Sequence, residues 1–481
     1  MNHYKTLRKL ITFFLPALFS ENIYSNSNCP SNLSALNCMT FMHKDTPLNY
    51  KKLSEERILN EGRLLKFELF SQNYPLQIET NKNEWVHTVS IYLPDNYRES
   101  TTPILYIDSG DNNNIKKNTI DFFSIAKQTH SMVISVDLVP NQPISFPTNP
   151  NLSEDYLVAH TWKLYIDDPI KNKINLLHLP MAMSAIKTMD LVQHEFLGTN
   201  YNVNSFIMSG ASKRGWAAWL ATIADSRVKA IIPIVIDIYN TKELFNKLYK
   251  IYAHNWPIAL YPYYKENMHK YLENKNFLEL LDIEDPIAYK KSDKRLRLNI
   301  PKFIISSSGD DFFPPDSIYE NYNHIPGKTY LKYVPNSSHF ISKPIIENSI
   351  ISFSNNLNSN FKSKIISYKI LEKDMGNLIE FRVTLTKDVK KISLWQAKNE
   401  TERDFRFACG IKYTETEYLI PKNHRLEIVI KKPEKGWEAS FIEITDNNSF
   451  VQTTPNIVLP RRVYPTSISK EKKDGCRVLP L

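Results

Sequence analysis

The chain has 481 residues, of which 42% are hydrophobic and 12% aromatic. This composition excludes an intrinsically disordered protein, and the length exceeds what a single hydrophobic core normally serves, so we expect two domains. The formal net charge is +9, but the basic residues are scattered among 51 acidic ones, which argues against a nucleic-acid partner.

The N-terminus has the parts of a secretory signal peptide, predicted at residues 1–20. A basic stretch precedes the apolar run Leu10–Phe19, and small and polar residues follow, so that cleavage is expected between Ser20 and Ser25. The alternative is an uncleaved anchor, but the run is shorter than the ~20 apolar residues that a spanning helix needs, and Pro16 interrupts it. We expect a secreted or periplasmic protein without stable membrane insertion.

Residues 26–361 alternate short apolar runs with longer amphipathic ones, the pattern of an α/β domain with a parallel sheet flanked by helices. Residues 237–300, rich in Tyr and Trp and without a strand pattern, are predicted to form a cap inserted into this domain. The pattern predicts about eight strands. The clearest predicted strands are 86–93, 104–107, 132–136, 205–208, 228–236, 302–306 and 329–334, and the predicted helices are 119–128, 181–193, 213–224 and 343–357.

Beyond this domain the apolar residues recur with a period of two, as in Leu426-Glu-Ile-Val-Ile. Such alternation is typical of antiparallel strands with one buried face. We therefore predict a β-sandwich domain at 362–465, followed by a charged tail at 466–481.

The strongest local signal is Phe206-Ile-Met-Ser-Gly-Ala-Ser-Lys-Arg-Gly-Trp, in which an apolar strand enters a turn of small residues and then a helix. This pattern is typical of the nucleophile elbow of an α/β-hydrolase, with Ser212 as nucleophile. The N–H of Lys213 and the start of the helix would face the developing oxyanion. The usual Gly-x-Ser-x-Gly form is altered, because Arg214 stands second after the serine and Gly215 third.

An acid and a histidine follow the last two predicted strands of the domain. Asp310 and His339 stand in polar loops after these strands, so the chain order is Ser, Asp, His, as in α/β-hydrolases. His339 would take the proton of Ser212 during attack and return it to the leaving group, while Asp310 would fix the imidazole tautomer. Asp311 and Asp237, which follows an earlier strand, remain alternative acids.

Other residues are candidates for roles around Ser212. Gly110 or Asp111, in the loop after an early strand, could supply the second N–H of the oxyanion hole, or could belong to an Asn-rich surface turn. Arg214 could bind an acidic substrate group, or could anchor its helix in a buried ion pair. Aromatic residues of the cap could line a substrate pocket or form the core of the cap. They are Tyr249, Tyr252, Trp256, Tyr261, Tyr263 and Tyr264.

The four cysteines lie near the two ends of the chain. An even number in an exported protein suggests disulfides, and pairing Cys29 with Cys38 and Cys409 with Cys476 is the simplest of three connectivities. Four free thiols are the alternative. The spacing is not that of a zinc site, and the sequence predicts neither a metal nor a cofactor.

Several long and unusual sequence motifs occur in a set order along most of the chain. They are Pro140-Asn-Gln-Pro, Ser153-Glu-Asp with His160-Thr-Trp, Leu179-Pro-Met, Gly210-Ala-Ser-Lys-Arg-Gly-Trp, Gly309-Asp-Asp-Phe-Phe with Pro315-Asp-Ser, Val334-Pro-Asn, Leu394-Trp-Gln-Ala, Arg403-Asp-Phe-Arg and Gly436-Trp-Glu-Ala. With these motifs the chain resembles the PhoPQ-activated pathogenicity-related protein family, which includes secreted autocrine proliferation repressors.

The resemblance implies an exported, α/β-hydrolase-like protein with Ser212, Asp310 and His339 as its triad. The elbow is also similar to that of glucuronoyl esterases. Two positions depart from the family pattern, because Asp311 stands where the family has Glu and because Phe340 follows the histidine. Links of the family to virulence, envelope defence or growth-inhibitory signals concern biological role rather than chemistry.

Two functions are compatible with these observations. The first is an exported serine hydrolase that acts on an ester or peptide bond of a small-molecule, glycan or peptide substrate. The second is a non-catalytic secreted binding or signalling protein on a hydrolase scaffold, with the β-sandwich and the cap as surfaces for a protein partner. Labelling of Ser212 by a serine-directed probe separates the two.

Overall fold

The structure is a computed structural model that describes residues 34–76, 78–113, 120–359, 367–468 and 472–480. The predicted signal peptide and its cleavage site therefore lie outside the described residues. Within the described ranges, no helix combines the length and the apolar character that crossing a membrane requires.

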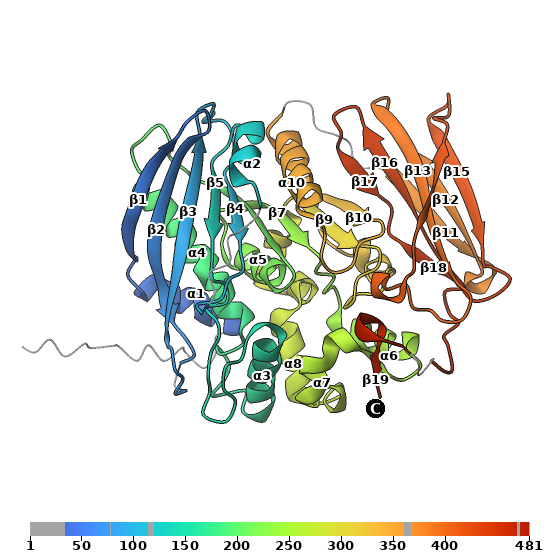
Figure 1. Ribbon diagram of the computed structural model, residues 1–481, viewed down its shortest axis with the longest axis horizontal. Coiled ribbons are helices and arrows are strands. Elements are labelled where there is room, and N and C mark those ends of the chain that lie inside the picture. Colours follow the sequence, from blue (N-terminus) through green and yellow to red (C-terminus); the bar gives the residue numbers. More distant parts are fainter. Residues whose placement is uncertain (1–33, 77, 114–119, 360–366, 469–471, 481) are drawn as a thin grey trace, which may run out of the picture.

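A nine-stranded sheet forms the centre of the larger unit, in the order β1-β2-β3-β5-β4-β6-β7-β9-β10. In Figure 1 it extends from β1 at the left to β10 beside the C-terminal sheets. The first three strands pair antiparallel, β3 is also antiparallel to β5, and all pairs from β5 to β10 are parallel. The strands are β1 (Asn49–Ile58), β2 (Gly62–Asn73), β3 (Glu84–Pro94), β4 (Ile104–Ile107), β5 (Val133–Val136), β6 (Phe206–Ala211), β7 (Val228–Ile234), β9 (Lys302–Ser307) and β10 (Thr329–Val334).

From β2 to β10 this strand order, with β3 antiparallel to its neighbours and the order reversed at β4 and β5, is that of the α/β-hydrolase fold, as predicted. The sheet has one strand more than the eight expected. The additional strand β1 carries charged residues on both faces and is largely exposed, so its sequence lacks the apolar alternation that would have predicted it.

Helices cover both faces of the sheet, and alternate residues of the short, fully buried strand β4 contribute to the two cores. Leu105 and Ile107 join the core under α1, α4 and α5, whereas Ile104 and Tyr106 join the core under α2 and α10. Burial on both faces explains why the parallel strands read as continuous apolar runs. The helices are α1 (Ala35–Asp45), α2 (Phe122–Thr129), α4 (His178–Glu195), α5 (Lys213–Ala224) and α10 (Lys343–Asn358).

The segment predicted as a cap is mostly helical, and α3 packs against two of its helices. In Figure 1 these helices lie together below the sheet. The prediction that the segment lacks strands is wrong at β8, because this short strand pairs with β19 at the far end of the chain. The elements are α3 (Glu154–Asp167), α6 (Thr241–Ile251), β8 (Trp256–Pro257), α7 (Tyr261–Lys265), α8 (Lys275–Glu284) and β19 (Val478–Leu479).

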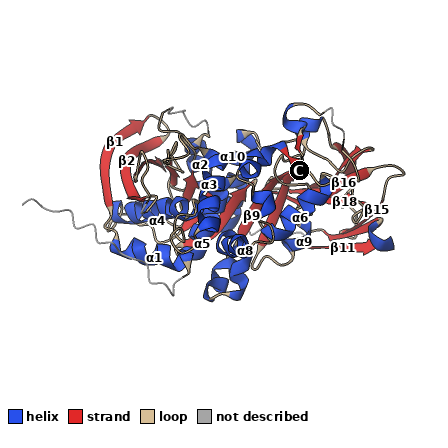
Figure 2. Ribbon diagram, turned by 90° about the horizontal axis from the view of Figure 1, so that it is seen from below, coloured by secondary structure: helices blue, strands red, loops and turns tan. Residues whose placement is uncertain are grey.

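Two antiparallel sheets form the C-terminal unit and share one apolar core. Figure 1 shows them beyond β10, which contacts β17, and Figure 2 shows β11, β15, β16 and β18 together at the same end of the molecule. The predicted boundary near residue 361 lies outside the described residues. One sheet contains β11 (Ser367–Lys373), β12 (Leu378–Thr384) and β15 (Arg425–Lys431), and the other contains β13 (Val389–Asn399), β14 (Thr414–Tyr418), β16 (Trp437–Asp446), β17 (Val451–Thr453) and β18 (Ile457–Leu459).

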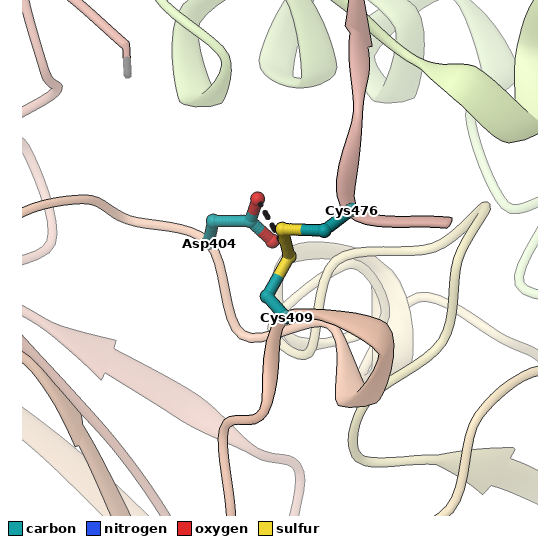
Figure 3. Close-up of side chains that lie close together, drawn as sticks. All are labelled: Asp404, Cys409 and Cys476. Carbon is teal, nitrogen blue, oxygen red and sulfur yellow. Dashed lines mark hydrogen bonds between the residues drawn. A yellow bond between two sulfur atoms is a disulfide. The ribbon is translucent and has the colours of Figure 1, made fainter. Parts of the chain in front are cut away.

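A disulfide holds the C-terminal tail to the loop after β13. The predicted pairing of Cys409 with Cys476 is confirmed, and the Asp404 carboxylate lies beside the two sulfur atoms (Figure 3). Cys38 is disulfide-bonded, but the predicted partner Cys29 lies outside the described residues.

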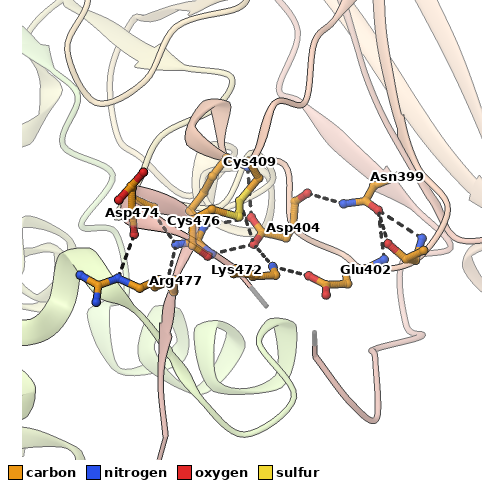
Figure 4. Close-up of a disulfide and its surroundings, with 11 residues drawn as sticks. Asn399, Glu402, Asp404, Cys409, Lys472, Asp474, Cys476 and Arg477 are labelled. Atoms are coloured by element: carbon orange, nitrogen blue, oxygen red, sulfur yellow. Dashed lines mark hydrogen bonds and ion pairs between the residues drawn. A yellow bond between two sulfur atoms is a disulfide. The ribbon is translucent and has the colours of Figure 1, made fainter. Parts of the chain in front are cut away.

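Ionic and hydrogen-bonding contacts reinforce this attachment of the tail. Lys472 pairs with Glu402 and, at 2.7 Å, with Asp404 (Figure 4). The Arg406 guanidinium donates to the carbonyl oxygens of Gly475 and Cys476 at 3.0 and 2.7 Å. Residues 472–477 of the tail are therefore attached to the folded structure.

Candidate active site

Ser212 stands at the turn between β6 and α5, at the carboxyl ends of the parallel strands. Its backbone has φ 56° and ψ −128°, a conformation that a residue with a side chain rarely adopts and that costs on the order of 1–3 kcal/mol. The Ser212 N–H donates to the carbonyl oxygen of Ile234 at 2.8 Å. The fold thus holds this serine in the strained geometry of a nucleophile elbow.

Two glycines let α5 approach β6 closely around the serine. A Cβ at Gly210 would lie 2.8 Å from the carbonyl of Arg214, and a Cβ at Gly215 would lie 2.8 Å from the carbonyl oxygen of Gly210. Only glycine, which has no Cβ, therefore fits at these two positions without displacing the neighbouring backbone. This explains how the elbow tolerates Arg214 at the position where the common motif has glycine.

A continuous chain of hydrogen bonds joins Ser212, His339 and Asp310. Ser212 Oγ lies 2.8 Å from His339 Nε2, and His339 Nδ1 lies 2.9 Å from Asp310 Oδ2. Asp310 Oδ1 also accepts the N–H of Phe312 at 2.8 Å. Burial of the imidazole opposes its protonation, but the Asp310 carboxylate outweighs this effect and raises the pKa of His339 above its ordinary value.

The two alternative acids make other contacts. Asp311 Oδ2 accepts the backbone N–H of His339, at 3.5 Å. Asp237 accepts the hydroxyls of Ser306 and Ser317 at 2.7 and 2.8 Å, and burial raises its pKa to about 6. Among the three candidate acids, the carboxylate of Asp310 is the one that reaches the His339 ring.

Arg214 takes part in a buried ion-pair cluster behind the elbow. Its Nη1 and Nη2 each donate to Glu154 at 2.7 Å, and its Nε donates to the carbonyl oxygen of Val139 at 2.6 Å. Lys213 Nζ pairs with the same Glu154 at 2.8 Å and with Asp155 at 3.2 Å. These contacts anchor α5 to α3 and the preceding loops, which is the structural alternative given for Arg214 in the sequence analysis.

A cavity of about 540 Å³ opens beside Ser212 and His339. Most of its walls are apolar side chains from α5, the loop after β9 and the cap. Besides the serine and histidine, it is lined by Asp155, Trp162, Lys213, Trp216, Ile236, Ile238, Thr241, Leu244, Phe245, Leu248, Leu260, Tyr263, Phe312 and Phe313.

Of the six cap aromatics considered as candidates for a substrate pocket, Tyr263 lines this cavity and the other five do not. Tyr252 packs under the Arg406 guanidinium, Trp256 packs edge-on against Phe245, and Tyr261 is 43% exposed at the surface. The Tyr and Trp content predicted an aromatic cap, but composition alone does not indicate which rings turn toward the serine.

The oxyanion candidates fall into two groups. Lys213 lines the cavity and begins α5, so its backbone N–H is one of the first-turn donors that have no carbonyl partner within the helix. Gly110 and Asp111 are not among the residues that line the cavity. The carbonyl of Gly110 accepts from Gln142, and the carboxylate of Asp111 accepts from the N–H of Asn113, which is the surface-turn alternative of the sequence analysis.

Comparison with solved structures gives only distant similarities. Acetyl xylan esterase 1 from Thermoanaerobacterium sp. JW/SL YS485 has a TM-score of 0.46 and 14% identity, over 68% of this chain and 93% of that chain. A glucuronoyl esterase from Solibacter usitatus has a TM-score of 0.40 and 13% identity, over 64% of this chain and 85% of that chain.

Sequence comparison is more specific. The chain is 32% identical over 403 residues to autocrine proliferation repressor protein A of Dictyostelium discoideum. This aligned region covers 78% of this chain and 79% of that protein. A family model described as PhoPQ-activated pathogenicity-related protein matches residues 36–406. The chain therefore belongs to the PhoPQ-activated pathogenicity-related protein family, as its sequence motifs predict.

Proposed function

We propose that the protein is a serine hydrolase that cleaves an ester bond with Ser212 as nucleophile, His339 as general base and Asp310 as the orienting acid. The observation that carries the proposal is the hydrogen-bond chain from Ser212 Oγ through both His339 ring nitrogens to Asp310, at distances of 2.8 and 2.9 Å. The strained turn at Ser212 and the adjoining cavity support it.

The geometry supports the following acyl transfer. Ser212 Oγ attacks the carbonyl carbon of the ester while its proton moves to His339 Nε2, and Asp310 stabilises the resulting imidazolium. The N–H of Lys213 donates to the developing oxyanion. His339 then gives the proton to the departing alkoxide, and a water molecule, activated by the same imidazole, hydrolyses the acyl-serine and returns Ser212 to its starting state.

Export is part of the proposal. The disulfide between Cys409 and Cys476 favours an oxidising compartment, and the N-terminal sequence pattern favours secretion or the periplasm. The intact mass of protein recovered from the periplasm or the culture medium tests this. Cleavage between Ser20 and Ser25 is the expected result, and an uncleaved chain in the membrane fraction contradicts it.

A fluorophosphonate probe tests the nucleophile directly. We expect labelling of the wild type and of Ser338→Ala, a control serine beside His339 whose hydroxyl accepts the N–H of Phe340. Ser212→Ala should not be labelled, and His339→Ala should be labelled at least about a hundredfold more slowly, because the general base is lost.

The outcome also separates catalysis from the non-catalytic alternative. If the folded wild type is not labelled, or if Ser212→Ala retains the full biological effect of the protein, the hydrolase scaffold serves as a binding surface. Circular dichroism and thermal unfolding of each variant show whether a loss of labelling comes from the chemistry or from unfolding.

A further inference from the structure

A second apolar space lies under the cap, next to the cavity at Ser212. The empty space there, part of which is open to solvent, is about 280 Å³. Phe245, Leu260 and Tyr263 line both spaces, so these three side chains form the partition between them. The remaining walls of the second space are Trp256, Tyr264, Met268, His269, Leu272 and Phe277.

The partition is built from side chains on three different cap elements. Phe245 lies on α6, Leu260 ends the 3₁₀ turn before α7, and Tyr263 lies on α7. The Tyr263 hydroxyl donates to Asp155 at 3.1 Å, which fixes one side of the partition. Leu260 is 7% exposed. Its hydrocarbon side chain has no hydrogen-bonding atom, so its size can be changed without removing a hydrogen bond.

The chemistry of the walls favours a hydrocarbon over a sugar or a charged group. Among the described residues that line the first cavity, the one lysine or arginine is Lys213, and its Nζ is already paired with Glu154 and Asp155. Hydroxyls or a carboxylate of a buried sugar would lose their water without gaining equivalent partners along the aliphatic and aromatic walls. By contrast, each methylene transferred from water to such walls strengthens binding about fourfold.

The position of His339 indicates which part of an ester enters the two spaces. The leaving alcohol takes its proton from His339 and must depart before water attacks. His339 itself is buried, but the next residue, Phe340, is 86% exposed, so the alcohol has a short path to solvent past the histidine. The acyl part stays bonded to Ser212 through both steps. The space enclosed by the cap therefore suits the acyl part.

We propose, on the basis of the hydrolase function above, that the two spaces form one acyl-binding site for the hydrocarbon chain of a fatty acyl ester. Phe245, Leu260 and Tyr263 set the chain length. Short chains occupy the first cavity alone, and longer chains pass the partition into the second space.

Hydrolysis of p-nitrophenyl esters with acyl chains from acetate to dodecanoate tests the proposal. In the wild type, kcat/KM should rise about fourfold per methylene until the chain meets the partition. Leu260→Ala should raise the ratio of kcat/KM for decanoate to that for acetate by about tenfold or more, and Leu260→Phe should lower it by a similar factor. Leu296→Ala, at a cap leucine that is 68% exposed, is the matched control and should keep the wild-type ratio.

Two outcomes overturn the acyl-site proposal while leaving the hydrolase function intact. One is a chain-length profile that is the same in both Leu260 variants and in the wild type. The other is faster hydrolysis of acetylated sugars or uronate esters than of any alkyl ester. If no ester is cleaved, the hydrolase proposal has failed instead.

Binding to the inactive variant tests the acyl site without catalysis. Calorimetric titration of Ser212→Ala with methyl octanoate should give saturable binding with a negative heat-capacity change. Adding Leu260→Phe should weaken this binding at least about tenfold. An absence of binding to folded Ser212→Ala overturns the site regardless of whether the wild type is active.

Discussion

The backbone N–H of Phe407 donates a hydrogen bond to the carbonyl oxygen of Gly309 at 3.0 Å. Gly309 directly precedes Asp310, whereas Phe407 belongs to the loop after β13 in the C-terminal unit. The same loop carries Arg403, which is almost fully buried and pairs at 2.6 Å with Asp316. The C-terminal unit thus contacts the segment around Asp310 at two points and helps to hold the carboxylate against His339.

Replacing Gly309 with alanine should disturb this contact. The new Cβ would lie 2.7 Å from the Phe407 nitrogen and 3.0 Å from the Ser337 carbonyl oxygen, so one of the loops must shift. We expect destabilisation of about 1–3 kcal/mol and a fall in esterase kcat/KM of at least tenfold. Gly198→Ala is the control, since its Cβ meets no atom within 4 Å and only its positive φ should cost stability. Wild-type kcat/KM in Gly309→Ala would contradict the coupling.

The disulfide should stabilise the same loop from the other side. The double variant Cys409→Ser, Cys476→Ser opens a link between residues 67 positions apart, which should lower the free energy of unfolding by about 2–4 kcal/mol. We also expect kcat/KM to fall, because the loop that contacts Gly309 loses its attachment to the tail. Urea unfolding and ester hydrolysis measure the two effects. Equal stability of variant and wild type would show that the ionic contacts of Lys472 and Arg406 suffice.

Much of the site could be predicted because its residues sit where regular elements begin or end. The helix after Ser212 and the strand before His339 occupy the residues that were predicted for them, 213–224 and 329–334. Local signals define such boundaries, since a small-residue turn and an apolar run lie within a few positions of each other. Strand order then brings the three loops to one edge of the sheet.

The features that the sequence did not predict carry no such local signal. Helix α3 buries consecutive residues from Leu157 to Trp162, so it lacks the one-sided apolar stripe that identifies an amphipathic helix. The anchoring of Arg214 by Glu154 joins residues 60 positions apart and follows only from the packing of α3 against α5. The walls of the cavity were missed for the same reason, because they come from several distant segments.

The ion pair behind the elbow should contribute measurably to stability. Glu154→Gln leaves the buried Arg214 and Lys213 with less compensating charge, which should cost about 2 kcal/mol or more. This is below the ~3–5 kcal/mol typical of breaking a fully buried pair, because the Glu154 side chain is 39% exposed. Glu56→Gln, on the exposed strand β1, is the control. Thermal and urea unfolding at pH 7 check the prediction, and a loss no larger than that of the control contradicts it.

The pKa of His339 should appear in the pH dependence of catalysis. His339 accepts a proton only when neutral, and Asp310 raises the pKa of its imidazole above the ordinary 6.5 despite burial, so kcat/KM should fall as pH decreases through a value above 6.5. Asp310→Asn keeps an acceptor for the Phe312 N–H but removes the charge. It should move the acid limb to lower pH and reduce kcat by about 10⁴. Asp311→Asn is the matched control and should keep the wild-type limb, and an unshifted limb in Asp310→Asn contradicts the assignment.

Protonation of the buried Asp237 carboxyl should make the free energy of unfolding depend on pH. Burial raises the pKa of its carboxyl from 3.8 to about 6, so the folded state favours the protonated form. The stabilisation that comes from this preference is fully present below pH 3.8 and is lost as pH rises through about 6. At pH 8 the wild type therefore carries a buried carboxylate at a cost of about 3 kcal/mol. Asp237→Asn is neutral at every pH and can still bond Ser306 and Ser317, so its stability relative to wild type should rise by about 2 kcal/mol between pH 4.5 and pH 8, the part of this cost that develops over that range.

For Asp316→Asn, the stability relative to wild type should change with pH in the opposite direction, which gives a comparison. Burial opposes ionisation of Asp316, but Arg403 and Lys247 outweigh it and lower the pKa of the carboxyl below its usual range. The stability from that ionised group is present above the ordinary pKa of 3.8 and is lost as pH falls, so Asp316→Asn should be most destabilising relative to wild type at neutral pH. Urea unfolding of both variants across the same pH range distinguishes them. A relative stability of Asp237→Asn that does not change with pH would mean that Asp237 is already ionised in the fold at pH 4.5, and the two serine hydroxyls would then have to compensate its burial.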